Sequence, residues 1–251
     1  IKRLLAYHSV ENIGIIAMGL GLGLLGWSYN NAFVMVAGFA GGLLHVPNHA
    51  IFKGLLFLAA GSVAKATGCR NIEQLGGLLR RMPLTGVAFL TGSAAISGLP
   101  PLNGFISEFL VYAAAFFAVV EGPAGMAIPA IAAIGTLALI GGLAAACFTK
   151  AFGITFLGEP RSSSAAAARE SGPAMRMPML VLAACCFAVP WLAPWFTPGL
   201  FRIAAGISGV PAETWLARMP PLENAIFWVS AGSGVLLGLV LALAALRQAL
   251  L

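Results

Sequence analysis

Residues 45–53 read His45-Val-Pro-Asn-His49-Ala-Ile-Phe-Lys53, and the fold is decided by this stretch. Three protonatable side chains follow one another at intervals of four, inside a segment that stays apolar beyond Lys53. On a helix, such positions share one face and lie about 6 Å apart along the axis. A lysine inside a bilayer costs about 2.5–3.5 kcal/mol or more, so an apolar helix that carries one marks a functional site. Histidine titrates near pH 6.5, so it can bind and release a proton close to neutral pH. A row of such groups on one face has the chemistry that proton conduction requires.

The composition predicts an all-α, polytopic membrane protein. The 251 residues are 60% hydrophobic and 9% charged, and the mean hydropathy of +0.95 is too high for a soluble domain. The net charge of +6 fits basic loops on one side of a membrane better than nucleic-acid binding. The four cysteines form no CxxC pair, and the chain has no Walker A or GxGxxG motif, so we expect no metal, iron–sulfur cluster or nucleotide cofactor.

Hydropathy divides the chain into about seven transmembrane segments, with a polar loop at 158–175 before the C-terminal ones. Between two of them, Gly98-Leu-Pro-Pro-Leu-Asn-Gly104 precedes Glu108 and indicates a broken helix, the kind of element in which transporters place ion sites. An ordinary interhelical loop is the alternative. The predicted segments are 4–27, 32–66, 83–99, 102–120, 125–157, 176–196 and 223–247.

Basic residues predict the orientation. If seven segments alternate across the membrane, eight basic residues fall on one side and four on the other, which favours the first side as cytoplasmic. A merged pair of segments would move the later loops to the opposite side. The first group is Lys2, Arg3, Lys65, Arg70, Arg80, Arg81, Arg202 and Arg218, and the second is Arg161, Arg169, Arg176 and Arg247.

Other ionisable residues inside the predicted segments admit two interpretations each. Glu11 is either a membrane-embedded acid or a residue near the interface, and Lys150 is either functional or snorkels to the membrane surface. A lone histidine is usually a satisfied core residue, but the regular spacing of His45, His49 and Lys53 favours function.

Several motifs in order resemble the proton-translocating antiporter-like subunits of respiratory complex I, Mrp sodium/proton antiporters and group 4 hydrogenases. The first segment resembles an IKRxLAYSS motif, residues 45–63 resemble HxxxHAxFKxxLFLxxGSV, and residues 97–108 read SGLPPLNGFISE. The likeness covers roughly residues 1–160. Within that family, Glu11-Asn12, residues 72–77 and the Lys150-Ala-Phe-Gly stretch look most like component B of hydrogenase-4 and the formate hydrogenlyase membrane subunit.

The resemblance implies two inverted five-helix repeats, of which this chain would carry the second (1–157) together with C-terminal transmembrane helices (176–251). Lys53 then matches the central lysine, His45 and His49 a hydrated connecting row, and Glu108 the exit-side group, while Lys2 matches a basic residue before the first span. The family's first half-channel is absent from these residues. We therefore expect the chain to be a piece of a longer subunit.

The leading hypothesis is a proton-translocating subunit of a respiratory or hydrogenase-type oxidoreductase complex in the prokaryotic cytoplasmic (inner) membrane. The chain itself would do no redox chemistry. Its partners would be lipid, other membrane subunits and a peripheral redox module with iron–sulfur subunits. The first alternative is an Mrp-like cation/proton antiporter subunit, with sodium or protons as the ion. The second is a structural anchor whose channel has lost its function.

Overall fold

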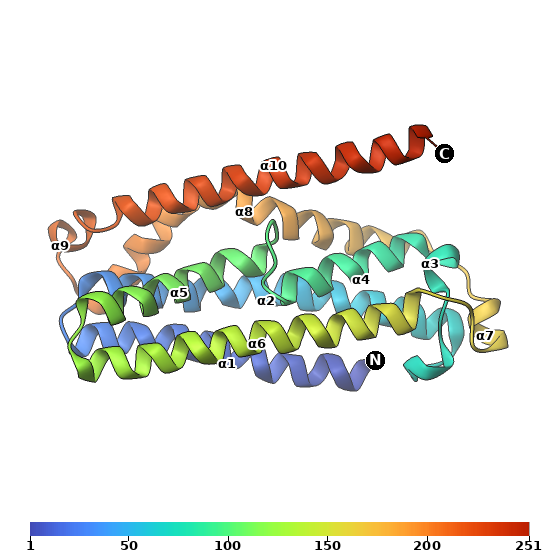
Figure 1. The fold of residues 1–251 in the computed structure, drawn as a ribbon, viewed down its shortest axis with the longest axis horizontal. Helices are drawn as coiled ribbons and strands as arrows, with labels where there is room; N and C mark the ends of the chain where they lie inside the picture. Colours follow the sequence, from blue (N-terminus) through green and yellow to red (C-terminus); the bar gives the residue numbers. More distant parts are fainter. Residues whose placement is uncertain (251) are drawn as a thin grey trace.

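The computed structural model describes residues 1–250, except the side chains of residues 208, 212, 244 and 247–250. All regular structure in that part of the chain is helical, which confirms the predicted fold class (Figure 1). Six of the helices described are long and apolar enough to cross a membrane. The helices are α1 (Lys2–Ser28), α2 (Ala32–Thr67), the 3₁₀ helix η1 (Ile72–Gln74), α3 (Leu78–Arg81), α4 (Pro83–Ile96), α5 (Asn103–Glu121), α6 (Ala124–Phe156), α7 (Ser163–Ala166), α8 (Pro173–Ser208), α9 (Ala212–Leu216) and α10 (Pro220–Leu250).

Helices α1 and α2 form an antiparallel hairpin in which glycines let the two backbones approach closely. A Cβ atom added at Gly19 would lie 2.7 Å from the Cα of Gly42, and one added at Gly38 would lie 2.5 Å from the backbone nitrogen of Gly23. Small residues serve the same purpose at many helix interfaces in membranes. The close approach holds the polar side chains of α1 directly against the polar face of α2.

A leucine at Gly19 is expected to destabilise this hairpin by about 1–3 kcal/mol, because the space between the backbones admits no side chain. Gly21→Leu is the matched control on the same helix, since a Cβ there meets no atom within 4 Å. The thermal midpoint of the tagged subunit, followed in solubilised membranes, should fall for Gly19→Leu and stay near the wild-type value for Gly21→Leu. Equal midpoints for the two variants would contradict the close approach.

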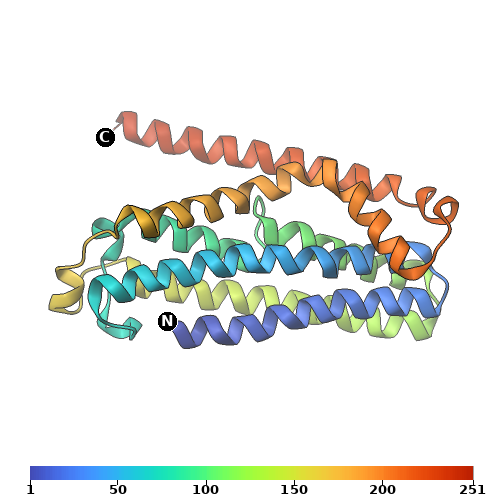
Figure 2. The ribbon, with the colours of Figure 1, turned by 180° about the vertical axis from the view of Figure 1, so that it is seen from behind.

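Helices α4 and α5 lie end to end and together make one discontinuous span. Both views show them along the same line, with residues 97–102 projecting at the joint (Figures 1 and 2). Both also pack along α2. At about 1.5 Å per residue, the 14 residues of α4 are shorter than the roughly 30 Å hydrocarbon core. The two predicted segments 83–99 and 102–120 are therefore the halves of one broken helix, and six spans cross rather than seven.

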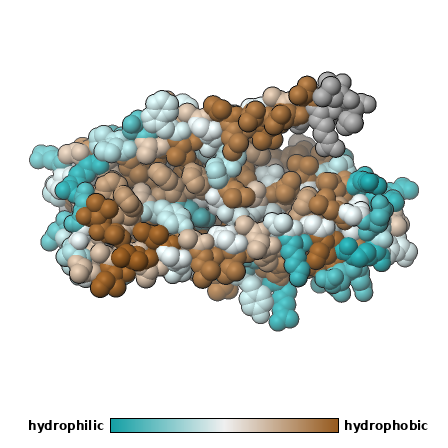
Figure 3. All heavy atoms as spheres, viewed as in Figure 1, coloured by the Kyte–Doolittle hydropathy of each residue, from teal (hydrophilic) through white to brown (hydrophobic). Residues whose placement is uncertain are grey.

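With six spans instead of seven, the loops after the broken helix lie on the membrane side opposite to the predicted one. The basic residues are therefore distributed differently between the two sides. One end of the bundle then carries nine basic residues, and the other carries Arg202 and Arg218. Hydrophilic side chains gather mainly toward the two ends (Figure 3). The side chain of Arg247 lies outside the described residues. The nine are Lys2, Arg3, Lys65, Arg70, Arg80, Arg81, Arg161, Arg169 and Arg176.

Helix α8 bends where prolines interrupt its hydrogen bonding, and it extends past the predicted end at residue 196 (Figure 2). Pro194 has no N–H to donate to the carbonyl of Pro190. Instead, the hydroxyl of Ser230 in α10 donates to that carbonyl at 2.7 Å. A neighbouring helix thus satisfies the freed backbone group, as an apolar environment requires.

The polar stretch predicted at 158–175 contains the short helix α7. Its side chains form hydrogen bonds to the backbone at the ends of several helices. Arg161 donates to the backbone carbonyls of Ile72, Glu73 and Ile154. The carboxylate of Glu170 accepts hydrogen bonds from the backbone nitrogens of residues 84 and 85, at 2.9 and 3.1 Å, and so caps the start of α4. The stretch thereby fixes the half-helix that leads into the break.

Candidate functional site

The predicted row on α2 faces α1. Lys53 Nζ donates to the carbonyl oxygen of Leu5 in α1, and one ring nitrogen of His45 contacts Asn12 of the same helix. The helical spacing places His49 between them. His45 is fully buried and Lys53 is only 5% exposed. The ring nitrogen Nε2 of His49 is buried without a hydrogen-bond partner among the described residues.

His45 joins three helices. Its Nε2 lies 3.1 Å from Asn12 Oδ1 in α1, and its Nδ1 lies 2.9 Å from Ser107 Oγ in α5. Next to it on α2, the amide of Asn48 donates to the carbonyl of Asn103 at 2.8 Å and to Ser107 Oγ at 3.0 Å. The first turns of α5, directly after the break, are therefore anchored on α2 by buried polar contacts.

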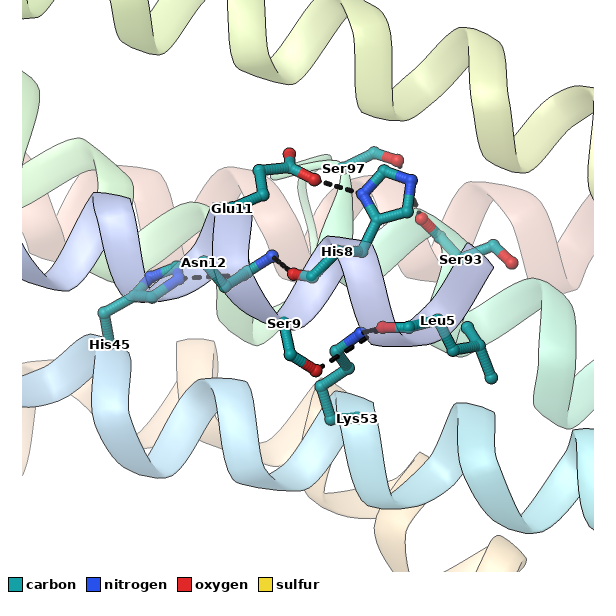
Figure 4. A network of polar contacts seen from close by, with 9 residues as sticks. All are labelled: Leu5, His8, Ser9, Glu11, Asn12, His45, Lys53, Ser93 and Ser97. Atoms are coloured by element: carbon teal, nitrogen blue, oxygen red, sulfur yellow. Dashed lines mark hydrogen bonds and ion pairs between the residues drawn. The ribbon is translucent and has the colours of Figure 1, made fainter. Parts of the chain in front are cut away.

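The ammonium group of Lys53 is held by neutral groups. Its Nζ donates to the carbonyl of Leu5, which also accepts from the hydroxyl of Ser9 at 3.4 Å (Figure 4). The ring of Phe57 lies 5.6 Å from Nζ, which is within cation–π range. Since neither contact is a carboxylate, the energetic cost of a charge at this position depends on the more distant ionisable groups.

Glu108 lies in the second turn of α5, immediately after Ser107, and is 8% exposed. Its carboxyl group rests against Gly98 in the break, where φ is +63° and an added Cβ would collide with the carboxylate oxygens. Gly98 is thus needed both for its backbone conformation and for the space it leaves. A cavity of about 330 Å³ adjoins Glu108 and is also lined by Ser97, Tyr112 and Gly141.

The other three predicted site residues, Glu11, Lys150 and Lys2, lie outside the row on α2. Glu11 is largely buried, with 19% of its side chain exposed, and contacts Nδ1 of His8 one turn earlier in α1. Lys150 is exposed toward the C-terminal end of α6, and this position fits its snorkelling interpretation. Lys2 is exposed at the first residue of α1. The structure brings neither lysine to the buried row.

Sequence reasoning missed His8, Asn12, Asn48 and Ser107 as members of the site. Each is a polar residue inside an apolar helix, which is a signal that the sequence carries. The partners of Asn12, Asn48 and Ser107 lie on other helices and could not be read from spacing along one helix. His8 instead contacts Glu11, three residues later on its own helix. Among the described residues, no group of three or more histidine, cysteine or glutamate side chains is placed to hold a metal ion.

Residues 1–133, more than half of the chain, match the family described as "NADH:quinone oxidoreductase/Mrp antiporter, TM". The chain belongs to this antiporter family. It is 44% identical to "Hydrogenase-4 component B" of Escherichia coli strain K12 over 215 residues, which cover 85% of this chain and 32% of that protein. It is 42% identical to "Formate hydrogenlyase subunit 3" of the same strain over 226 residues, covering 87% of this chain and 36% of the relative.

The antiporter-family fold is found in a solved structure as well. The Mrp complex from Dietzia sp. DQ12-45-1b matches 90% of this chain and 49% of one of its own chains, with a TM-score of 0.57 at 20% identity. The resemblance predicted from the motifs is therefore confirmed, and the protein is an integral membrane protein of the antiporter-like class. The chain spans about a third of the length of the two curated relatives.

Proposed function

We propose that this chain is the C-terminal part of a proton-translocating subunit in a membrane-bound hydrogenase-type or respiratory oxidoreductase complex. The observation that carries the proposal is the buried polar set that crosses from α2 to α5. Lys53 and Glu108 form its two titratable ends, and His45 bridges α1, α2 and α5 between them. An apolar bundle gains no stability from burying such groups, so their presence favours a role in ion movement.

Proton movement through this set would be driven by electrostatics. Two unit charges about 8 Å apart interact by about 2 kcal/mol at an effective dielectric of about 20. A change of charge in a neighbouring subunit would therefore move a proton from one buried group to the next without a large conformational change. No redox group is needed in this chain for that role.

The orientation follows from the basic end of the bundle. We propose that the end with nine basic residues faces the cytoplasm of a prokaryote, since positive residues are retained on that side of the inner membrane. The other end carries Arg202 and Arg218 together with Glu121, Glu213 and Glu223. A cysteine-accessibility assay on Ser163→Cys and Gly122→Cys should label the first position only from the cytoplasmic side and the second only from the outside.

The names of the relatives support a redox complex as the assembly. Both are described as parts of hydrogen-metabolising enzymes, and each matches well over four fifths of this chain. The test is to tag the full subunit in its native membrane, solubilise it gently and identify what co-purifies. Recovery of a hydrogenase large subunit with iron–sulfur proteins would support the proposal.

The alternative function is that of an Mrp-like cation/proton antiporter subunit driven by an ion gradient. The family includes the Mrp antiporters, and the solved Mrp complex shares the fold. In the same purification, small Mrp-like membrane subunits without any redox protein would support this alternative and overturn the redox assignment.

A further inference from the structure

The hydrogen bonds of His45 hold it in one orientation. The amide nitrogen of Asn12 donates to the backbone carbonyl of His8 at 2.8 Å, and this contact turns Asn12 Oδ1 toward His45. An amide oxygen only accepts hydrogen bonds, so His45 Nε2 must carry the proton of that contact. Its other nitrogen is engaged by Ser107. A proton leaving His45 toward α1 would have to pass through an amide, which is not an acid–base group near neutral pH.

A different titratable pair lies on α1. Nδ1 of His8 contacts Oε2 of Glu11, and the second carboxylate oxygen, Oε1, is buried without a hydrogen-bond partner among the described residues. The ring of His8 packs against Phe148 of α6, with centroids 4.6 Å apart. In the close-up view, His8 and Glu11 lie together on one side of α1 and Lys53 reaches α1 from the other side (Figure 4).

The pair lies about one helical turn from the carbonyl to which Lys53 donates, because Leu5 precedes His8 by three residues on α1. A cavity of about 240 Å³ is lined by Phe148, the ring partner of His8, and by Ser93 and Ser97 of the broken helix. Ser97 also lines the cavity of about 330 Å³ beside Glu108. Since one water occupies about 30 Å³ of liquid, both spaces are large enough for several waters.

We propose that the His8–Glu11 pair is the proton-carrying station between Lys53 and Glu108, and that His45 is a positioning residue. The inference rests on the proposed function. The ammonium of Lys53 would release one proton through water to the pair, in which the carboxylate and the imidazole share it. The pair would then pass that proton past Ser97 to the carboxylate of Glu108. One proton enters and leaves at each step, and no electrons are transferred.

His45 in this account orients Asn12 and Ser107, and through them α1 and α5. A side chain that preserves its two hydrogen bonds should therefore replace it. His45→Ala is expected to lower proton translocation, and His45→Gln should restore most of it, because glutamine supplies both a donor and an acceptor. Failure of His45→Gln to exceed His45→Ala in the assembled complex would overturn the positioning role.

The carrier is tested by His8→Gln in the whole complex, with Tyr7→Phe, an exposed neighbour on α1, as the matched control. Glutamine keeps a hydrogen bond to Glu11 but cannot take up a proton. Redox-driven proton translocation per assembled complex should fall about tenfold or more in His8→Gln and stay unchanged in Tyr7→Phe. Wild-type translocation in His8→Gln would overturn the inference.

A spectroscopic measurement covers the case in which His8→Gln does not assemble. Infrared difference spectra of the wild-type complex on pH change should contain a carboxylic-acid band that Glu11→Gln removes. The same band should shift in His8→Asn, because the pair shares its proton. Unchanged spectra in both variants would overturn the inference. If His8→Gln and Lys53→Met both translocate protons at the wild-type rate, the proposed function fails. If Lys53→Met loses translocation and His8→Gln does not, the proposed function stands and only the role of the His8–Glu11 pair is removed.

Discussion

Lys53→Met is expected to lower redox-driven proton translocation by about tenfold or more, because the change removes the buried group that we propose accepts and releases the proton. Methionine fits the same apolar surroundings, which include Phe57, so the fold of α2 should survive. The measurement is the initial rate of proton uptake by inverted membrane vesicles, expressed per assembled complex. Loss of the rate with normal assembly separates a conduction defect from a folding defect.

The matched control for this prediction is Lys65→Met on the same helix. Lys65 is exposed near the C-terminal end of α2, three turns beyond Lys53. Removing its charge changes only the basic end of the bundle, where solvent and salt screen the effect. The two variants should therefore differ widely, and similar rates in both would show that burial of the Lys53 ammonium has no part in transport.

Glu108→Gln is expected to produce a loss of the same size. Glutamine has nearly the shape of glutamate and can keep the contact with Gly98, but it cannot bind and release a proton. Glu108→Asp should keep part of the rate, because the shorter carboxyl group still titrates beside the same cavity. The assay is again proton uptake per assembled complex, followed together with redox turnover.

Glu121→Gln on the same helix is the control for Glu108. Glu121 is exposed at the end of α5 and pairs with Arg218 at 2.9 Å. An exposed pair of this kind contributes about 0–1 kcal/mol to stability, so translocation should stay near the wild-type rate. Glu108→Gln at the wild-type rate would exclude Glu108 as the exit-side group.

The sequence predicted the helices well because long apolar runs leave few alternatives in a membrane. The segments 4–27 and 32–66 correspond closely to α1 and α2. The broken helix was recognised from residues 98–104, but its two halves were counted as separate spans. Local hydropathy cannot tell a turn of the chain from a break within one straight span, since both contain glycine and proline. The structure decides between them, because α4 and α5 lie end to end along α2 (Figures 1 and 2).

The candidate site was predictable only in part, for a similar reason. Spacing of four identified the row from His45 to Lys53, because it depends on one helix alone. The contacts of His45 with Asn12 and Ser107 join residues far apart in the sequence and depend on how three helices meet. For Lys150, the sequence left two interpretations open, and burial, which only packing determines, separates an embedded lysine from an exposed one.

Proton transfer through the polar set is tested most directly by the number of protons moved per redox turnover. The purified complex is placed in sodium-free proteoliposomes, and Lys53→Met is compared with Lys65→Met. Lys65→Met should build the wild-type pH gradient, which a protonophore collapses, and turnover of Lys53→Met should build almost none. A Lys53→Met complex that moves as many protons per turnover as the wild type would contradict the claim that protons cross through the polar set between α1, α2 and α5.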